Sequence, residues 1–263
     1  MQSAATLKNA LAKKQPGIGF WLTFNAPSIC KTILAGGGFN WALIDAEHGQ
    51  ITDSDYYALT NLVASSGASP IIRVPYDLEW MIKRALDSGA HGVMTPMCHS
   101  ADDARRIVQY SKYPPRGTRG YGPMFSAHSF GLQEKEYPAG ADDNLLVIVQ
   151  IESRKAVENV EEIAAVDGID VLFIGPYDLS KFLNVQFGSE EHEAAIQRTL
   201  KAAKAAGKTA AIFCTSGEQA KMRLSQGFEM VSIVTDVGAL AAAFDRELAA
   251  VRGVEVGQAR SAY

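Results

Sequence analysis

Two acidic residues, Glu152 and Asp178, each follow a short apolar run, in the segments VQIES and FIGPYDLS. Such runs predict buried parallel strands, whose carboxyl ends meet at one edge of a sheet. Two carboxylates from adjacent strand ends, completed by waters, suit Mg²⁺ or Mn²⁺ and leave room for a bidentate oxygen ligand. Alternatively, each acid only caps the helix that follows it, as acids at helix starts commonly do.

Two further polar residues occur where a buried strand is expected, or directly after one. Arg73 interrupts the apolar run PIIRVP, and His48 lies in the acidic segment DAEHGQ that follows the run NWALI. A buried arginine is costly unless it is paired, and its planar guanidinium suits a carboxylate or an enolate oxygen. The alternative for Arg73 is an ion pair in the core. His48 could act as a general base beside a carboxylate, or be a hydrogen-bonded loop histidine.

The elements that would position these residues form a repeated strand–helix pattern. Eight apolar, mostly β-branched runs predict strands at Gly17–Phe24, Asn40–Asp45, Pro70–Val74, Gly92–Pro96, Leu145–Ile151, Asp170–Ile174, Thr209–Cys214 and Met230–Thr235. Segments with helical period lie between them, several beginning at a serine (Ser100, Ser153, Ser189) and ending at a glycine. Eight such units predict an α/β fold, a (β/α)₈ TIM barrel. A doubly wound sheet would need a G-x-G-x-x-G turn after an early strand, and GGGFN precedes a strand instead.

Length and composition limit the organisation and the partners. We predict a single domain over residues 1–263, with an N-terminal helix in 1–16 and a tail at 254–263. The net charge is −4 with no long basic run, which argues against nucleic acid as a partner. No apolar stretch is long enough to span a membrane. Three scattered cysteines predict no disulfide framework and favour a cytoplasmic location. The connection Lys112–Asn144 shows no clear period, which is typical of a lid or a binding loop.

Schiff-base chemistry would require a lysine within the barrel. No lysine interrupts a predicted strand: Lys208 precedes the seventh strand, and Lys155 lies just inside a helix. The positions of the lysines therefore argue against imine chemistry.

At these residues the sequence resembles the 4-hydroxy-2-oxoheptanedioate aldolase family, the class II pyruvate aldolases, to which macrophomate synthase is related. The resemblance covers nearly the whole chain, and its motifs occur in the family's order. They are LIDAEHG (Leu43–Gly49), IIRVP (Ile71–Pro75), ALDSGAHGVMTPM (Ala85–Met97), PPRGTRGYG (Pro114–Gly122), VQIES (Val149–Ser153) and FIGPYDLS (Phe173–Ser180).

The resemblance implies a catalytic and metal-binding set. Glu152 and Asp178 match the ligands of a divalent metal, which would be Mg²⁺, Mn²⁺ or Co²⁺. Arg73 matches the arginine that stabilises the enolate oxygen, and His48 matches the catalytic base. Asp87 matches the acidic partner of that base, reaching it from a neighbouring subunit or loop.

The resemblance also implies a substrate-binding set. Gln150 matches a residue that lines the pyruvate site, and Gly175 and Tyr177 belong to the loop whose backbone amides hold the pyruvate carboxylate. Trp21, in the first predicted strand, is assigned to the same set. Two positions depart from the family: Tyr177 stands where many members carry alanine, and Gln50 stands where proline is usual.

The implied activity is a carbon–carbon lyase that reversibly cleaves 4-hydroxy-2-oxo acids to pyruvate and an aldehyde. Two alternatives use the same enolate: an oxaloacetate decarboxylase, and an enzyme that traps the enolate as macrophomate synthase does. A third alternative is a non-catalytic binding barrel. The family assembles as homo-oligomers, which implies a hexamer or a trimer here. The C-terminal helix (Asp236–Val251) is compatible with an exchange of helices between subunits.

Overall fold

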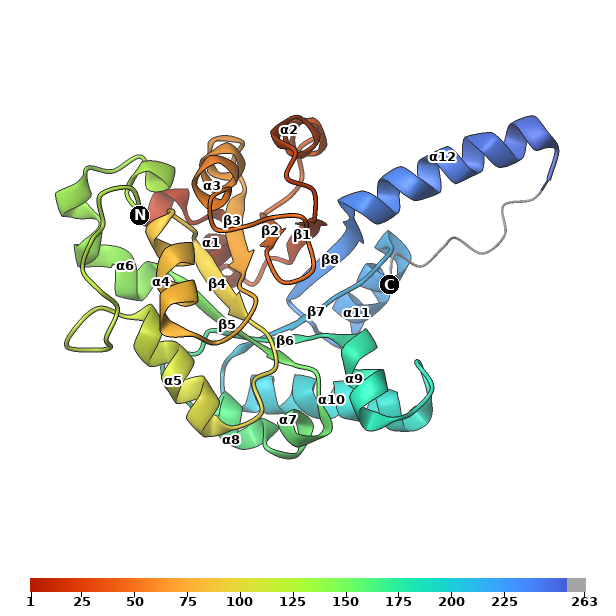
Figure 1. The fold of residues 1–263 in the computed structure, drawn as a ribbon. Helices are drawn as coiled ribbons and strands as arrows, with labels where there is room; N and C mark the ends of the chain where they lie inside the picture. The colour runs from red at the N-terminus through yellow and green to blue at the C-terminus, as the bar shows by residue number, and fades with distance from the viewer. Residues whose placement is uncertain (255–263) are drawn as a thin grey trace.

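The computed structural model describes residues 1–254 and confirms the predicted (β/α)₈ barrel. Each strand pairs in parallel with the next one along the chain, and the last pairs with the first, which closes the barrel (Figure 1). The strands are β1 (Gly17–Leu22), β2 (Trp41–Asp45), β3 (Ser69–Arg73), β4 (Gly92–Thr95), β5 (Leu146–Ile151), β6 (Val171–Ile174), β7 (Thr209–Ile212) and β8 (Met230–Thr235).

Helices surround the barrel and cover the outer face of its strands (Figure 1). They are α2 (Pro27–Ala35), α3 (Tyr56–Ser65), α4 (Glu79–Asp87), α5 (Ala101–Ser111), α6 (Pro138–Asn144), α7 (Arg154–Glu158), α8 (Val160–Ala164), α9 (Pro176–Leu183), α10 (Glu190–Ala205) and α11 (Gly217–Gln226). A last helix, α12 (Asp236–Arg252), follows β8. The hydroxyls of Ser100, Ser153 and Ser189 each accept a backbone N–H at a helix start, as predicted.

Two apolar clusters explain why the strands are hydrophobic on both faces. One lies between the strands and the helices, and the other fills the barrel interior, with Trp41, Met94 and Phe173 among its members. Gly19 is required in the interior because a Cβ built there would lie 2.2 Å from the Trp41 ring. Leu7 of α1 (Thr6–Ala12) joins the interior cluster, so α1 closes the amino-terminal end of the barrel.

The connection between α5 and β5 is more ordered than the sequence suggests. It contains the 3-10 helices η2 (His128–Phe130) and η3 (Glu134–Glu136), followed by α6. The side chain of Arg119 is fully buried beneath it and donates to Asp87 at 2.7 Å and to the Tyr137 hydroxyl at 3.2 Å. These elements were missed because they are too short to show a helical period and depend on such tertiary contacts.

The two ends of the chain differ. The predicted N-terminal helix is present as η1 (Gln2–Ala4) and α1, and the predicted C-terminal helix is present as α12. Helix α12 projects away from the barrel (Figure 1). Apart from Val254, the predicted tail lies outside the described residues. Within residues 1–254, no helix combines the length and the apolar character needed to cross a membrane.

Candidate active site

Polar side chains from several strands meet at the carboxyl-terminal end of the barrel. Asp45 and Arg73 are the last residues of β2 and β3, and Glu152 directly follows β5. A cavity opens among the strand ends, lined by Trp21, Arg73, Gln150, Gly175, Pro176, Tyr177, Asp178 and Phe213. Six of the nine residues assigned to the site from the sequence therefore line one cavity. This cavity lies at the end of the barrel where the active sites of TIM-barrel enzymes are found.

Arg73 is the centre of a buried ion network. Its Nε and Nη2 donate to the two carboxylate oxygens of Asp45 at 2.9 and 2.7 Å. Its Nη1 lies 2.8 Å from Glu47 Oε2 and 3.5 Å from Gln150 Oε1. The guanidinium also stacks over the Trp21 ring, 4.4 Å from its centroid. Arg73 thus forms the predicted ion pair in the core and also lines the cavity, and its role toward a substrate oxygen stays a prediction.

Glu152 is buried and held by hydrogen bonds at both oxygens. Oε1 accepts the Met97 backbone N–H at 2.9 Å, and Oε2 accepts from the Gln150 side-chain amide at 3.1 Å. Ser153, not Glu152, caps α7, so the alternative role of Glu152 as a helix cap is wrong. Gly175 is required beside this carboxylate, because a Cβ built there would lie 2.2 Å from Glu152 Oε2.

The charges around Glu152 favour a bound cation. Burial raises the pKa of Glu152 to about 8, and the negative charges of Glu47 and Asp178 act in the same direction. Burial also raises the pKa of Glu47, although Arg73 and His48 oppose that shift. A divalent cation would relieve this excess of buried acid, and oxygen donors of this kind suit Mg²⁺ or Mn²⁺. The donor set therefore fits a metal.

Few side chains are available as ligands to such a cation. Among the described residues, no group of three or more His, Cys, Asp or Glu side chains is arranged to hold a metal ion. Asp178 lines the cavity from the first turn of α9, so its position also satisfies the alternative interpretation as an acid at a helix start. A site of two carboxylates would leave its remaining positions to water and substrate oxygens.

His48 lies beside this network at the rim of the barrel. Its side chain is 52% exposed, and its Nε2 is 3.8 Å from Glu47 Oε1. Asp45 Oδ1 accepts the backbone N–H groups of Glu47 and His48 at 3.1 and 3.4 Å, which fixes the loop that carries them. Neither Asp45 nor Glu47 was assigned to the site from the sequence. Their signal in the sequence is the acidic segment DAEHGQ at the end of a predicted strand.

The structure of one chain does not bring Asp87 to His48. Asp87 ends α4, just before β4 begins, which places it at the opposite end of the barrel from the cavity. There it accepts from Arg119 Nη2 at 2.7 Å. A role beside His48 therefore requires a neighbouring subunit, and it stays a prediction.

Aromatic rings line one side of the cavity. Trp21 packs edge-on against Phe213, with ring centroids 4.9 Å apart, and Phe213 lies 6.2 Å from Tyr177. Phe187 stacks on Tyr177 at 4.7 Å with an interplanar angle of 24°. The sequence pointed to Trp21 and Tyr177 but not to Phe213 or Phe187, because apolar residues at such positions look like ordinary core.

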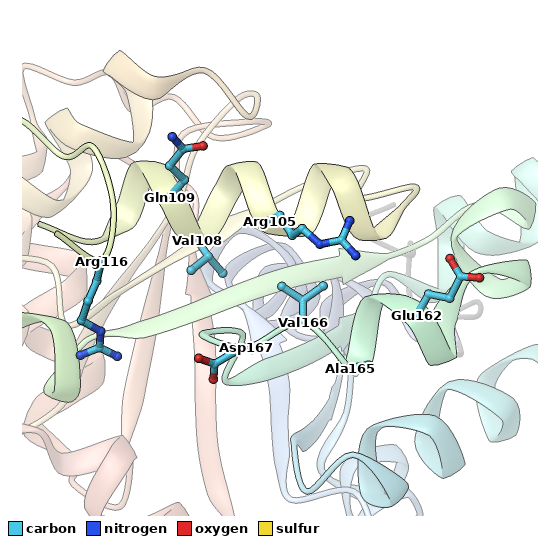
Figure 2. A pocket seen from close by; sticks show the side chains of 8 residues that line it. All are labelled: Arg105, Val108, Gln109, Arg116, Glu162, Ala165, Val166 and Asp167. Atoms are coloured by element: carbon cyan, nitrogen blue, oxygen red, sulfur yellow. The ribbon is translucent and has the colours of Figure 1, made fainter. Parts of the chain in front are cut away.

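A second cavity lies on the outer surface, between α5 and the end of α8 (Figure 2). It is lined by Arg105, Val108, Gln109, Arg116, Glu162, Ala165, Val166 and Asp167. Its two arginines pair with the nearby acids Asp102 and Asp143. This groove lies outside the barrel wall and contains none of the predicted site residues, so the cavity at the strand ends is the candidate active site.

A (β/α)₈ barrel with buried acids and an arginine at its strand ends has the architecture of a barrel enzyme. The chain belongs to the HpcH/HpaI aldolase/citrate lyase family, which matches residues 17–243. It is 38% identical over 240 residues to the hydroxypyruvate/pyruvate aldolase of Deinococcus radiodurans, covering 90% of this chain and 86% of the relative. It is 35% identical over 244 residues to the 2-keto-3-deoxy-L-rhamnonate aldolase of Escherichia coli, covering 92% and 91%.

A solved structure agrees with the sequence relatives. An HpcH/HpaI aldolase/citrate lyase family protein from Burkholderia cenocepacia superposes with a TM-score of 0.87 at 33% identity, covering 94% of this chain and 99% of the other. The chain is therefore an enzyme of the class II aldolase type. Its relatives are named for different substrates, so the likeness supports the wider family and not the narrower 4-hydroxy-2-oxoheptanedioate aldolase group.

Proposed function

We propose that this protein is a divalent-metal-dependent aldolase that reversibly cleaves 4-hydroxy-2-oxo acids to pyruvate and an aldehyde. The observation that carries the proposal is the buried Glu152, held by Met97 and Gln150 beside the arginine of the cavity. A fully desolvated carboxylate is unfavourable without a compensating charge. Membership of an aldolase family supports the same chemistry.

Glu152 and Asp178 would hold the metal, which would be Mg²⁺, Mn²⁺ or Co²⁺. A bound divalent cation supplies Lewis acidity, which withdraws electrons from a 2-oxo group and acidifies the adjacent carbon. The remaining chemistry belongs to the side chains and to the backbone of the chain.

In this proposal Arg73 acts on the 2-oxo oxygen, where negative charge develops during cleavage. Its Nε and Nη2 are held by Asp45, which fixes the direction of the guanidinium before substrate arrives. Gln150 bonds Glu152 through its amide and places its carbonyl oxygen near Arg73, so it orients both groups. The backbone N–H groups of Gly175 and Tyr177, at the start of α9, would hold the substrate carboxylate.

His48 is the proposed base. In cleavage it would take the proton of the 4-hydroxyl as the C3–C4 bond breaks and the aldehyde carbonyl forms. In the reverse reaction, aldol addition, it would return that proton to the new hydroxyl. Glu47 Oε1, 3.8 Å from His48 Nε2, is placed to stabilise the charged imidazole. Delivery of the proton to the C3 carbon then completes pyruvate.

We also propose that the protein works as a homo-oligomer, a hexamer or a trimer. Helix α12 extends from the barrel (Figure 1). Its apolar residues Leu240, Phe244, Leu248 and Val251 are exposed. An exposed stripe of this kind favours burial against another subunit.

If Asp87 acts on His48 across an interface between subunits, mixing inactive Asp87→Asn and His48→Asn subunits would restore part of the activity. No restoration would contradict that role of Asp87.

The proposal is tested by following pyruvate methyl protons in D₂O and by assaying a panel of 2-oxo acids with aldehydes. We expect exchange and aldol addition with added Mg²⁺ or Mn²⁺, and loss of both on chelation. Borohydride with pyruvate should leave no covalent adduct. Exchange at an undiminished rate in metal-stripped protein would overturn the proposal. Faster turnover of oxaloacetate than of any 4-hydroxy-2-oxo acid would favour the decarboxylase alternative.

A further inference from the structure

The cavity has two unlike sides. Arg73, Gln150 and Asp178 form a polar side, while Trp21, Phe213 and Tyr177 form an aromatic side, backed by Phe187. The four rings Trp21, Phe213, Tyr177 and Phe187, which we call the aromatic wall, are in continuous contact. In the proposed function the 2-oxo acid occupies the polar side, next to Trp21, which stacks on Arg73. The rest of the aromatic wall, Phe213, Tyr177 and Phe187, is then left to face the other reactant.

His192 holds the aromatic wall in place from behind. It is buried on α10, its Nδ1 accepts the Gly188 backbone N–H at 3.1 Å, and its Nε2 lies 2.8 Å from the Pro176 carbonyl oxygen. Because Nδ1 accepts a hydrogen bond, the ring proton is on Nε2 and is donated to Pro176. His192 therefore ties the start of α9, which carries Tyr177, to the segment that carries Phe187.

The aromatic wall carries no positive charge to pair with a second carboxylate. Among the described residues that line the cavity, Arg73 is the single cation, and its guanidinium is already engaged by Asp45 and Glu47. A carboxylate buried against these rings would lose its water without gaining an opposite charge, which is unfavourable.

We propose that the aromatic wall binds the tail of an uncharged aldehyde with an apolar chain and discriminates against aldehydes that carry a carboxylate. Tyr177 and Phe187 determine this specificity, and His192 is the positioning residue that holds them. The inference rests on the proposed function, because it names the acceptor class of the same site.

The direct test compares two acceptors of the same shape with the metal-loaded full-length protein and pyruvate. These are 4-methylpentanal and 4-oxobutanoate, in which an isopropyl group is replaced by a carboxylate. We expect kcat/KM for 4-methylpentanal to be at least about tenfold higher, since apolar pockets discriminate on this scale. Equal values, or a preference for 4-oxobutanoate, would overturn the inference.

A variant and a matched control assign the discrimination to the aromatic wall. Phe187→Ala should lower the ratio of the two kcat/KM values by about tenfold. Phe182→Ala removes another exposed phenylalanine, from α9, and should leave the ratio unchanged. If Phe187→Ala leaves the ratio as it was, or if Phe182→Ala lowers it equally, the aromatic wall does not determine specificity.

The positioning role of His192 is tested by a conservative pair. His192→Leu should raise KM for 4-methylpentanal more than it lowers kcat, and His192→Gln, which keeps a donor for Pro176, should restore part of the loss. Equal defects in the two variants would contradict this role. Methyl exchange of pyruvate without aldehyde separates the two proposals: exchange without discrimination overturns the inference alone, and no exchange overturns the proposed function beneath it.

Discussion

Two buried arginines, Arg73 and Arg119, have similar local contacts and different surroundings. Each pairs with an aspartate and stacks on aromatic rings: Arg73 with Asp45 and Trp21, and Arg119 with Asp87 and Tyr113. Their side chains are 3% and 0% exposed. Burial and ion pairing alone therefore do not distinguish a site residue from a structural one.

The difference lies in the balance of charge. Three further acids, Glu47, Glu152 and Asp178, lie near Arg73 besides its partner Asp45, and Arg73 lines a cavity. Around Arg119 one aspartate and two tyrosines are present, and Arg119 lines neither the cavity at the strand ends nor the outer groove. An excess of buried acid next to open space indicates a cation site, whereas a balanced, enclosed pair holds a loop in place.

The largest expected effect is on activity, from a change at one of the acids near Arg73. Glu152→Gln should lower kcat/KM on the order of a thousandfold, because it removes a charged ligand and transition-state stabilisation with it. The midpoint of thermal unfolding of metal-free protein should not fall, since glutamine still accepts the Met97 N–H without a desolvated charge. Kinetics, metal analysis and calorimetry measure these effects, and a variant that binds metal as the native protein does would contradict the assignment.

Conservative changes at the two arginines sharpen the contrast. Arg73→Lys should lower kcat/KM about a hundredfold, because lysine cannot bind Asp45 with two donors and still direct a third at the cavity. Arg119→Lys should instead lower the free energy of unfolding by about 3 kcal/mol. Steady-state kinetics and urea unfolding on both variants measure the two effects. The reverse pattern, with the greater kinetic loss at Arg119, would refute the comparison.

Acid should weaken the region around Arg119 through His91, which stacks on Phe130 of the same connection at 4.1 Å. Burial lowers the pKa of His91 to about 3, so the fold favours the neutral ring. The stability that the neutral His91 contributes is fully present above its unfolded pKa of about 6.5 and is lost as the pH falls towards 3. The loss in free energy of unfolding at pH 5 is about 2 kcal/mol. Unfolding from pH 7 to 5 should therefore be less pH-dependent in His91→Leu, and identical slopes would exclude His91 as the cause.

The smallest expected effects come from two glycines that each make room for a large neighbour. Gly175→Ala would press on Glu152 and should weaken metal binding about tenfold, a loss of about 1.4 kcal/mol in binding free energy. Gly19→Ala would press on Trp41 in the barrel interior and should lower stability by about 1 kcal/mol without a specific loss of metal affinity. Titration calorimetry and urea unfolding distinguish them, and weaker metal binding in Gly19→Ala alone would be the contrary result.

The barrel and much of its site follow from local patterns. Parallel strands are buried on both faces, so each appears as an apolar run, and a polar residue at its end, such as Arg73 or Glu152, is visible against it. Contacts between distant segments leave no such pattern. The Met97 N–H that fixes Glu152 comes from 55 positions away, and Phe187 becomes part of the site only because it stacks on Tyr177. Asp87 shows the same limit, since its proposed partner would lie on another subunit.

The most direct test of the account is a crystal structure of the protein with Mn²⁺ and pyruvate, with the ion located by its anomalous signal. The account predicts one ion bound by a carboxylate oxygen of Glu152 and one of Asp178, with the 2-oxo oxygen of pyruvate facing Arg73. An ion bound elsewhere, or pyruvate held in this cavity with no ion between these two acids, would contradict it.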